Sequence, residues 1–314
     1  MASPYPLTTL KGNSVTTHRI VEILREEGID ARGSHGFDGE PADVLIILHA
    51  VKGAKAVFDY RRACPKGKVI VLTTGTDIYQ FLREGSAEGD RALETADAVV
   101  VVFERAVQSL DARWREKTFV VPSSLAPVNV LANPECPPFA ISVVGHLRPV
   151  KQPFLTIEAV ARHPEWKKVE VWQIGEALDD SCAAEAREWE RRDPRYRWFG
   201  GIPREESLAL CARSSLTVNS SILEGGANAV LEAMTMGVPV LASRIEGNIG
   251  LLGNDYPGYF EGPMDEALTA VIEGRAGISA WSRHSKARLP RFSREHEAAC
   301  WLDLLSKLHY FPSS

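Results

Sequence analysis

The fold is decided by the stretch from Asn219 to Gly253, NSSILEGGANAVLEAMTMGVPVLASRIEGNIGLLG. An apolar run predicts a buried strand, Leu216–Asn219, that leads into it. The run Ala227–Met236 has the apolar content of a buried helix, and Pro239–Ser243 predicts the next buried strand. A strand, a helix and a second strand in this order are typical of a βαβ unit in a parallel α/β sheet.

Two glutamates and two glycines in this stretch indicate a ligand site. Gly225, Gly226 and Asn228 come directly after Glu224, where the strand gives way to the helix. Free backbone N–H groups and the positive end of the helix dipole suit a phosphate there. Glu232 lies about two helical turns beyond Glu224, so both carboxylates can face one cleft and accept hydrogen bonds from sugar hydroxyls. A solvated helix face would show the same spacing, but the apolar neighbours favour a site for a sugar nucleotide.

Composition and charge exclude several classes of protein. With 314 residues, 45% hydrophobic and 25% charged, the chain can bury a sizeable core. A net charge of −5 argues against nucleic acid as a partner. No apolar run approaches the ~18 residues of a membrane span, and no signal peptide is recognised. The five cysteines are widely spaced and odd in number, so no disulfide or zinc site is predicted and a cytoplasmic location is expected.

Strand-like and helix-like runs alternate along both halves of the chain, which predicts two parallel sheets. In the first half the predicted strands are Val44–His49, Val69–Leu72, Ala98–Phe103 and Phe119–Val121. In the second half they are Ile141–Val144, Val169–Ile174, Tyr196–Phe199, Leu216–Asn219 and Val238–Ala242. The proline-bearing segment Pro127–Pro138 is interpreted as a linker. The predicted domains are residues 1–138 and 139–293, each Rossmann-like, with ligand loops at the carboxyl ends of the strands.

Polar residues follow three of the predicted strands and are candidates for ligand contacts. The turn Thr73–Asp77 offers hydroxyl and backbone N–H groups to a small anion, and Asp77 is also predicted to cap a helix. His49 ends the strand Val44–His49, and Asn248 lies in a predicted turn after Val238–Ala242. For His49 and Asn248 a purely structural hydrogen bond is the alternative.

Several segments together resemble a known family. The E-x(7)-E element with GVPVLAS resembles the donor-binding signature of family-4 glycosyltransferases, which have the GT-B fold. EGGANAVLEAM, ASRIEGNIGLLGNDYPGYF, VVGHLRPVKQPF and LTTGTDIY are similar to the selenosugar synthases of selenoneine biosynthesis. The resemblance covers nearly the whole chain. It implies two Rossmann-like domains facing across a cleft, with a last helix in residues 294–314 that crosses back to the first domain.

The resemblance assigns a donor to the second domain and an acceptor to the first. It implies a UDP-sugar donor, selenophosphate as acceptor and a 1-seleno-sugar as product, with no metal and no cofactor. The implied donor-binding residues are Gly145, His146, Lys151, Glu224, Gly225, Gly226, Asn228 and Glu232, and the implied catalytic residues are Lys151, Arg148 and Glu224. The predicted acceptor residues are Gly12, Asn13, His49, Thr74, Gly75, Thr76, Asp77 and Asn248.

One departure from the family concerns the amino terminus. Ser3-Pro4 stands almost at the start, where related chains have an apolar first strand before a Ser-Pro turn. Met1 and Ala2 cannot make a strand of about five residues. Either the start is truncated or the first domain has fewer strands.

Two other functions remain open. An O-glycosyltransferase acting on a sugar or small alcohol would need a base in the first domain, with Asp77 or His49 as the candidate. A sugar-nucleotide-binding protein without turnover is the third hypothesis. The identity of the sugar, the stereochemical outcome and the oligomeric state do not follow from these residues.

Overall fold

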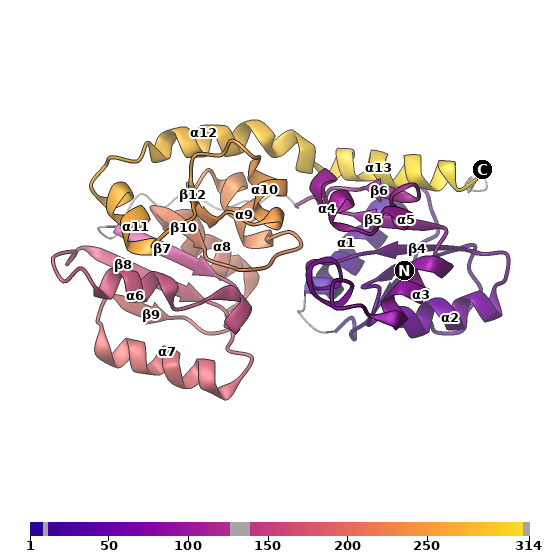
Figure 1. Cartoon of the computed structure of the whole chain (residues 1–314), viewed down its shortest axis with the longest axis horizontal. Coiled ribbons are helices and arrows are strands. Elements are labelled where there is room, and N and C mark those ends of the chain that lie inside the picture. Colours follow the sequence, from indigo (N-terminus) through magenta and orange to yellow (C-terminus); the bar gives the residue numbers. More distant parts are fainter. Residues whose placement is uncertain (9–11, 126–138, 310–314) are drawn as a thin grey trace. The chain divides into compact units, whose positions relative to one another are not determined.

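The computed structural model describes residues 1–8, 12–125 and 139–309. The chain forms two compact units, Met1–Ser124 with Arg291–Ser314 (unit 1) and Leu125–Pro290 (unit 2) (Figure 1). Each unit is built on a six-stranded sheet in which all the paired strands run parallel. The predicted fold class, two Rossmann-like α/β domains, is confirmed. The predicted linker, 127–138, lies outside the described residues.

The sheet of unit 1 has the strand order β2-β1-β3-β4-β5-β6. Its strands are β1 (Ala2–Ser3), β2 (Ser34–His35), β3 (Val44–Leu48), β4 (Lys68–Leu72), β5 (Ala98–Val101) and β6 (Thr118–Val120). Its helices are α1 (Gly12–Glu26), α2 (Ala54–Ala63), α3 (Ala87–Thr95), α4 (Glu104–Ser109), α5 (Ala112–Arg115) and α13 (Arg294–Lys307), with a single π-helical segment, η1 (Asp77–Phe81), after β4.

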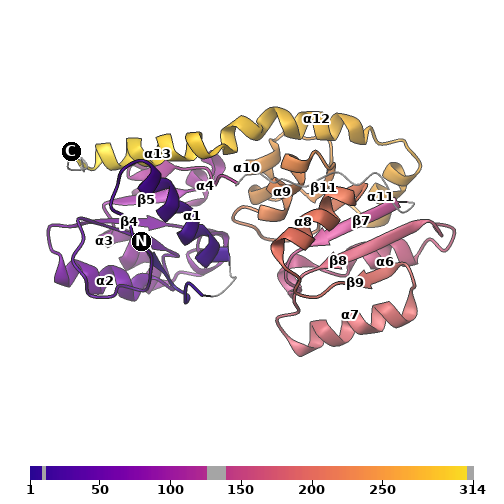
Figure 2. The ribbon, with the colours of Figure 1, turned by 180° about the vertical axis from the view of Figure 1, so that it is seen from behind.

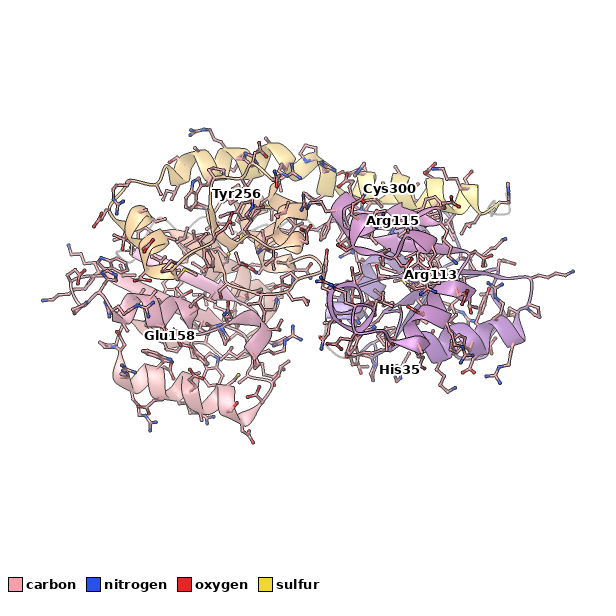
Figure 3. All side chains as sticks on the ribbon, in the orientation of Figure 1. His35, Arg113, Arg115, Glu158, Tyr256 and Cys300 are labelled. Carbon is pink, nitrogen blue, oxygen red and sulfur yellow. The ribbon has the colours of Figure 1, made fainter. Side chains whose placement is uncertain are left out.

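Alternating side chains of the central strands bury both faces of this sheet. On β3, Leu45 and Ile47 belong to one apolar cluster, which α2 and α3 cover. Ile46 and Leu48 belong to the other cluster, which also takes Trp301 from α13. Figures 1 and 2 show α13 beside α1 over this sheet, with Cys300 of α13 labelled in Figure 3. The last helix therefore completes the core of unit 1.

A buried carboxylate also holds α13 to unit 1. Glu297 is 1% exposed, and its carboxylate lies 3.1 Å from Nε of Arg19 on α1. The same carboxylate accepts a hydrogen bond of 2.7 Å from the backbone N–H of Ser124, the last residue of the first segment of unit 1. Because a buried charge needs partners, these contacts fix both the register of α13 and the end of this segment.

The sheet of unit 2 has the strand order β12-β11-β10-β7-β8-β9. Its strands are β7 (Phe139–Val144), β8 (Val169–Ile174), β9 (Tyr196–Trp198), β10 (Leu216–Asn219), β11 (Val240–Ser243) and β12 (Tyr259–Phe260). Its helices are α6 (Leu155–Ala161), α7 (Asp180–Arg192), α8 (Arg204–Arg213), α9 (Asn228–Met236), α10 (Glu246–Leu252), α11 (Met264–Ile272) and α12 (Ile278–Arg288), with 3₁₀ turns η2 (Pro149–Lys151) and η3 (Leu289–Phe292), the latter at the boundary with unit 1.

A tyrosine ties the segment after α10 to this sheet. Tyr256, labelled in Figure 3, donates its hydroxyl to the Val240 carbonyl of β11 at 2.6 Å. Its ring packs edge-on against Tyr259 and Trp281. The edge strand β9 at the other side of the sheet lies beside α7 (Figure 2). No helix of the described part of the chain is both long and apolar enough to cross a membrane.

The structure corrects three local expectations. Residues 2–3 do form a strand, β1, because pairing with β2 and β3 stabilises a strand of only two residues. The helix-like run 104–114 predicts a single helix, but the helix is broken at Leu110, which is extended, and Asp111 caps a second helix by accepting from the N–H of Arg113. The helix α12, which the apolar pattern did not indicate, packs against α9 and α10.

Candidate functional site

The loop after β7 presents cations at the carboxyl end of the unit 2 sheet. His146 and Arg148 are exposed, whereas Leu147 between them is buried and donates its N–H to Glu176 O at 2.9 Å. The alternation anchors the loop through Leu147 and leaves both basic side chains at the surface. Gly175 permits this path, because a Cβ there would lie 2.0 Å from the Gly145 carbonyl oxygen.

Lys151 and Glu224 form an ion pair between two strand-end loops. The Lys151 Nζ contacts Glu224 Oε1, and Ser221 Oγ donates to the same oxygen at 2.7 Å. The side chains keep 20% and 10% of their surface, respectively. Lys151 lies in η2 after β7, whereas Glu224 follows β10, the neighbouring strand. The structure therefore brings together two predicted site residues that are far apart in the sequence.

Two serines that were not among the predicted site residues fix the loops after β7, β10 and β11. Ser220 Oγ donates to the carbonyls of Lys151 and Gln152 at 2.9 and 3.0 Å, which fixes the backbone of η2. Ser243 Oγ donates to Ser221 O at 2.5 Å, which links the ends of β10 and β11. The sequence feature that could have predicted their role is that these serines come at or directly after the carboxyl ends of predicted strands.

Gly247 sets the position of Glu224. A Cβ on Gly247 would lie 2.3 Å from the Glu224 carbonyl oxygen, so any other residue would push the Glu224 backbone away. The predicted turn at 247–248 is wrong, because both residues lie in α10. Asn248 is fully buried, and its Nδ2 donates to Asn219 Oδ1 at 3.1 Å and Ser243 O at 2.9 Å. The Asn248 side chain thus ties strand ends together, instead of presenting its amide at the surface for the predicted acceptor contact.

The helix α9 begins with its amino end uncapped by any side chain. Its N-cap residue is Ala227 and its first residue is the exposed Asn228, preceded by Gly225 and by Gly226 with φ of 153°. First-turn N–H groups therefore remain for an anion. One expectation needs correction: Glu224 lies in the loop before α9, so the two glutamates are not two turns apart on one helix.

Glu232 is the member of the pair that lies on α9. Its carboxylate pairs with Arg204, the first residue of α8, at 2.9 Å, and its side chain is 13% exposed. Burial raises the pKa of Glu232, and the Arg204 guanidinium opposes this shift. Arg204 was not among the predicted site residues, although it opens a helix just before the site.

The predicted acceptor residues of unit 1 cluster at the carboxyl ends of β3 and β4. His49 is 2% exposed and Asp77 is fully buried, and His49 Nδ1 contacts Asp77 Oδ1 as a close pair. Asp77 Oδ2 accepts from the N–H of Thr74 at 2.8 Å, and His49 Nε2 lies 3.1 Å from Thr76 Oγ1. Gly75 lies within this turn. The predicted helix cap is thus corrected: Thr76 precedes η1, and Asp77 is its first residue.

Gly12 and Asn13 are the first two residues of α1. The resemblance implies a glycine-bearing loop at these two residues, but they form a helix start, and residues 9–11 lie outside the described residues. Asn13 O accepts a hydrogen bond from Thr17 Oγ1 at 2.9 Å. Among the described residues no cluster of three His, Cys, Asp or Glu side chains is arranged to hold a metal ion.

Residues 130–273 match the family described as "Glycosyl transferases group 1". The matched residues include the loop after β7, the Lys151–Glu224 pair and α9. The matched residues belong to the sheet that carries the predicted donor site.

Two curated relatives match parts of the chain. The glycosyltransferase 1 domain-containing protein 1 of Xenopus tropicalis is 36% identical over 114 residues, which cover 36% of this chain and 33% of that protein. The sucrose synthase of Melioribacter roseus is 27% identical over 113 residues, covering 32% of this chain and 14% of that protein. The chain thus matches a third or less of the length of these relatives.

Solved structures resemble the whole chain. Anabaena HepE in complex with UDP-glucose has a TM-score of 0.74 and 15% identity, with 98% of this chain and 99% of that chain covered. The lipopolysaccharide outer core galactosyltransferase WaaB in its apo form has a TM-score of 0.63 and 16% identity, with 93% and 79% covered. These likenesses show that the fold is that of GT-B glycosyltransferases.

Proposed function

We propose that the protein transfers a sugar from a UDP-sugar to selenophosphate and forms a 1-seleno-sugar. The observation that supports the UDP-sugar donor is the Lys151–Glu224 pair, which joins a cationic loop and an acidic loop within the residues that match the glycosyltransferase family. The structural relative HepE binds UDP-glucose, which supports a UDP-sugar. The acceptor half rests on the sequence resemblance to selenosugar synthases.

The donor chemistry follows from the charges around Lys151. The bond between C1 of the sugar and the diphosphate oxygen breaks, and negative charge develops on the leaving UDP. Lys151, Arg148 and His146 on one side, and the open N–H groups of α9 with Gly225 and Gly226 on the other, would stabilise that charge. Glu224 would accept hydrogen bonds from the donor sugar, and Glu232 from the ribose. These groups make a metal unnecessary for binding the diphosphate.

The acceptor chemistry requires a nucleophile that attacks C1 through selenium. Selenophosphate is anionic and soft, so it attacks without a strong base. The residues Thr74 and Thr76 are half-buried after the end of β4, and their hydroxyls would contact its oxygens. A sugar or small alcohol is the second candidate acceptor, because the His49–Asp77 pair supplies the base that a hydroxyl needs.

The test is to incubate the protein with selenophosphate and a panel of UDP-sugars and to follow the products by mass spectrometry. We expect UDP and a 1-seleno-sugar from at least one donor, and neither from Lys151→Ala under the same conditions. O-glycosides formed from added alcohols, with selenophosphate left intact, would contradict the acceptor. UDP-sugar binding by calorimetry without any turnover would instead identify a sugar-nucleotide-binding protein.

A further inference from the structure

A hydrogen-bonded chain in unit 1 runs from a buried carboxylate to the hydroxyl of a half-buried residue, Thr76. Asp77 contacts His49 through Nδ1, and the opposite ring nitrogen, Nε2, lies 3.1 Å from Thr76 Oγ1. Asp77 and His49 are buried, so Thr76 is the member of this chain that has exposed surface. His49 also has a φ of 73°, a conformation that costs energy in a non-glycine residue. The strained backbone holds the ring between the carboxylate and the hydroxyl.

The surroundings of Asp77 determine where the His49 proton lies. Oδ2 is occupied by the N–H and the hydroxyl of Thr74, at 2.8 and 3.2 Å. Oδ1 faces His49 Nδ1, and an ionised carboxylate only accepts hydrogen bonds, so Nδ1 carries the proton. The N–H of Lys52 approaches Nδ1 at 3.2 Å, but the carboxylate is nearer and charged. Nε2 of the neutral ring therefore presents a lone pair to Thr76.

We propose that Asp77, His49 and Thr76 form a proton relay for the acceptor. The inference rests on the proposed glycosyl transfer, but it is independent of which protic acceptor is used. The acceptor atom forms a bond to C1 of the sugar while the bond from C1 to UDP breaks, and UDP leaves with the electron pair. The acceptor proton passes to Thr76 Oγ1, and the Thr76 proton passes to His49 Nε2. The imidazolium is then stabilised by the Asp77 carboxylate.

The Asp77→Asn variant tests this relay with almost no change of shape. We expect the new amide to keep its oxygen at the Oδ2 position, because the Thr74 N–H donates there at 2.8 Å, whereas the Val51 N–H lies 3.4 Å from Oδ1. Its NH₂ group then faces His49 Nδ1, which has to become an acceptor, so the ring proton moves to Nε2. An Nε2 that already carries a proton cannot take one from Thr76. The variant therefore removes the base by reversing the tautomer.

The experiment compares Thr76→Val, Thr76→Ser and Asp77→Asn with the wild-type protein at saturating UDP-sugar, with glycerol or water, which must lose a proton, as acceptor. We expect kcat to fall about 100-fold in Thr76→Val and Asp77→Asn, the lower range for general base catalysis, and to stay within about threefold in Thr76→Ser. Binding of UDP should be unchanged in all three. Asp179→Asn, which alters an exposed helix-capping aspartate of unit 2, is the matched control and should keep its activity.

Two outcomes would overturn the relay. If Thr76→Val raised only the acceptor KM and left kcat unchanged, Thr76 would bind the acceptor without moving its proton. Nitrogen-15 NMR of the histidine rings gives a readout that does not need activity. We expect His49 to be protonated at Nδ1 in the wild type and at Nε2 in Asp77→Asn, and an Nε2-protonated wild type would refute the relay. Absence of transfer to any acceptor would refute the proposed function, while the NMR result would still decide the proton position.

Discussion

The two units place polar side chains at the same structural position, the carboxyl ends of parallel strands, but they treat charge differently. In unit 2 the pairs Lys151–Glu224 and Arg204–Glu232 keep part of their surface. In unit 1 the carboxylate of Asp77 is fully buried against His49, and the residues Thr74 and Thr76 beside it are half-buried. A partly exposed ion pair can exchange its partner for a charged ligand, whereas a buried pair fixes the direction of a hydrogen bond. We therefore expect unit 2 substitutions to act on donor binding and on the leaving diphosphate, and unit 1 substitutions to act on stability and on proton transfer from the acceptor.

The largest effect is expected for Asp77→Ala. This change leaves the Thr74 N–H and the His49 ring without their buried partner, so the free energy of unfolding of unit 1 should fall by about 3–5 kcal/mol. UDP affinity should not change in the folded protein. Urea titration followed by tryptophan fluorescence measures the free energy of unfolding, and calorimetry measures the affinity for UDP. Asp179→Ala should destabilise far less, because Asp179 only caps α7 at the surface. If the free energy of unfolding fell equally in both variants, the buried charge of unit 1 would be no more important for stability than an exposed one in unit 2.

Lys151→Ala should lower turnover with little effect on stability. Loss of one group that stabilises the leaving diphosphate lowers kcat by about 100-fold. The melting temperature should change little, because the lysine side chain is already partly exposed. Steady-state kinetics and a thermal melt check the two expectations, with the exposed Lys167→Ala as control. An early-melting variant that keeps its activity would give Lys151 a structural role and remove the distinction between the two units.

Gly247→Ala should weaken donor binding without touching any charged group. The new methyl would meet the Glu224 carbonyl oxygen at 2.3 Å, so the Glu224 loop has to move. If binding requires the original position of the loop, a strain of about 2 kcal/mol lowers the affinity for UDP-sugar roughly 30-fold. Gly262→Ala, where a Cβ meets open space, should bind normally in the same calorimetric assay. Normal binding by both variants would show that Glu224 does not need its observed position.

Glu232→Gln should have the smallest effect of the four, a roughly tenfold loss of UDP affinity, because a charge-assisted hydrogen bond to the ribose is lost. Burial raises the pKa of Glu232 in the folded protein, so protonation favours folding. The stability that this carboxyl contributes is present below its unfolded pKa and is lost as the pH rises through its folded pKa. As the pH decreases, Glu232 becomes protonated and the wild-type affinity for UDP should fall. This fall should begin at a higher pH than it would for a glutamate with an ordinary pKa.

Calorimetry from pH 5 to pH 8 measures this effect, and Glu232→Gln should show a flatter profile. Glu205→Gln, at an exposed position of α8, is the control that should behave like the wild type. A tenfold loss of affinity without a loss of stability near pH 8 would support the view that unit 2 uses its charges for the ligand. Unchanged affinity in Glu232→Gln would contradict the ribose assignment.

Much of the fold could be predicted because it depends on local patterns. The strands Val169–Ile174 and Leu216–Asn219 were predicted with the observed bounds, because short runs rich in β-branched and apolar residues are typical of strands. The predictions were wrong where pairing or capping overrides the local pattern, as in β1 and at Asp111. The helix α10 was missed because its glycines suggest a turn, whereas Gly247 is there to admit the Glu224 backbone.

The sequence by itself determined the βαβ alternation, the two parallel sheets and the residue types of the donor loops, since these follow from periodicity and from motifs within about 35 residues. Only the tertiary structure decided which side chains share a contact: Lys151 with Glu224, Glu232 with Arg204, and Asp77 with His49. Such pairs depend on which strands are neighbours in a sheet, and burial then decides whether a charge stays available to a ligand. Both are properties of the packed chain, because neither neighbouring strands nor buried surface can be assigned to a residue in isolation.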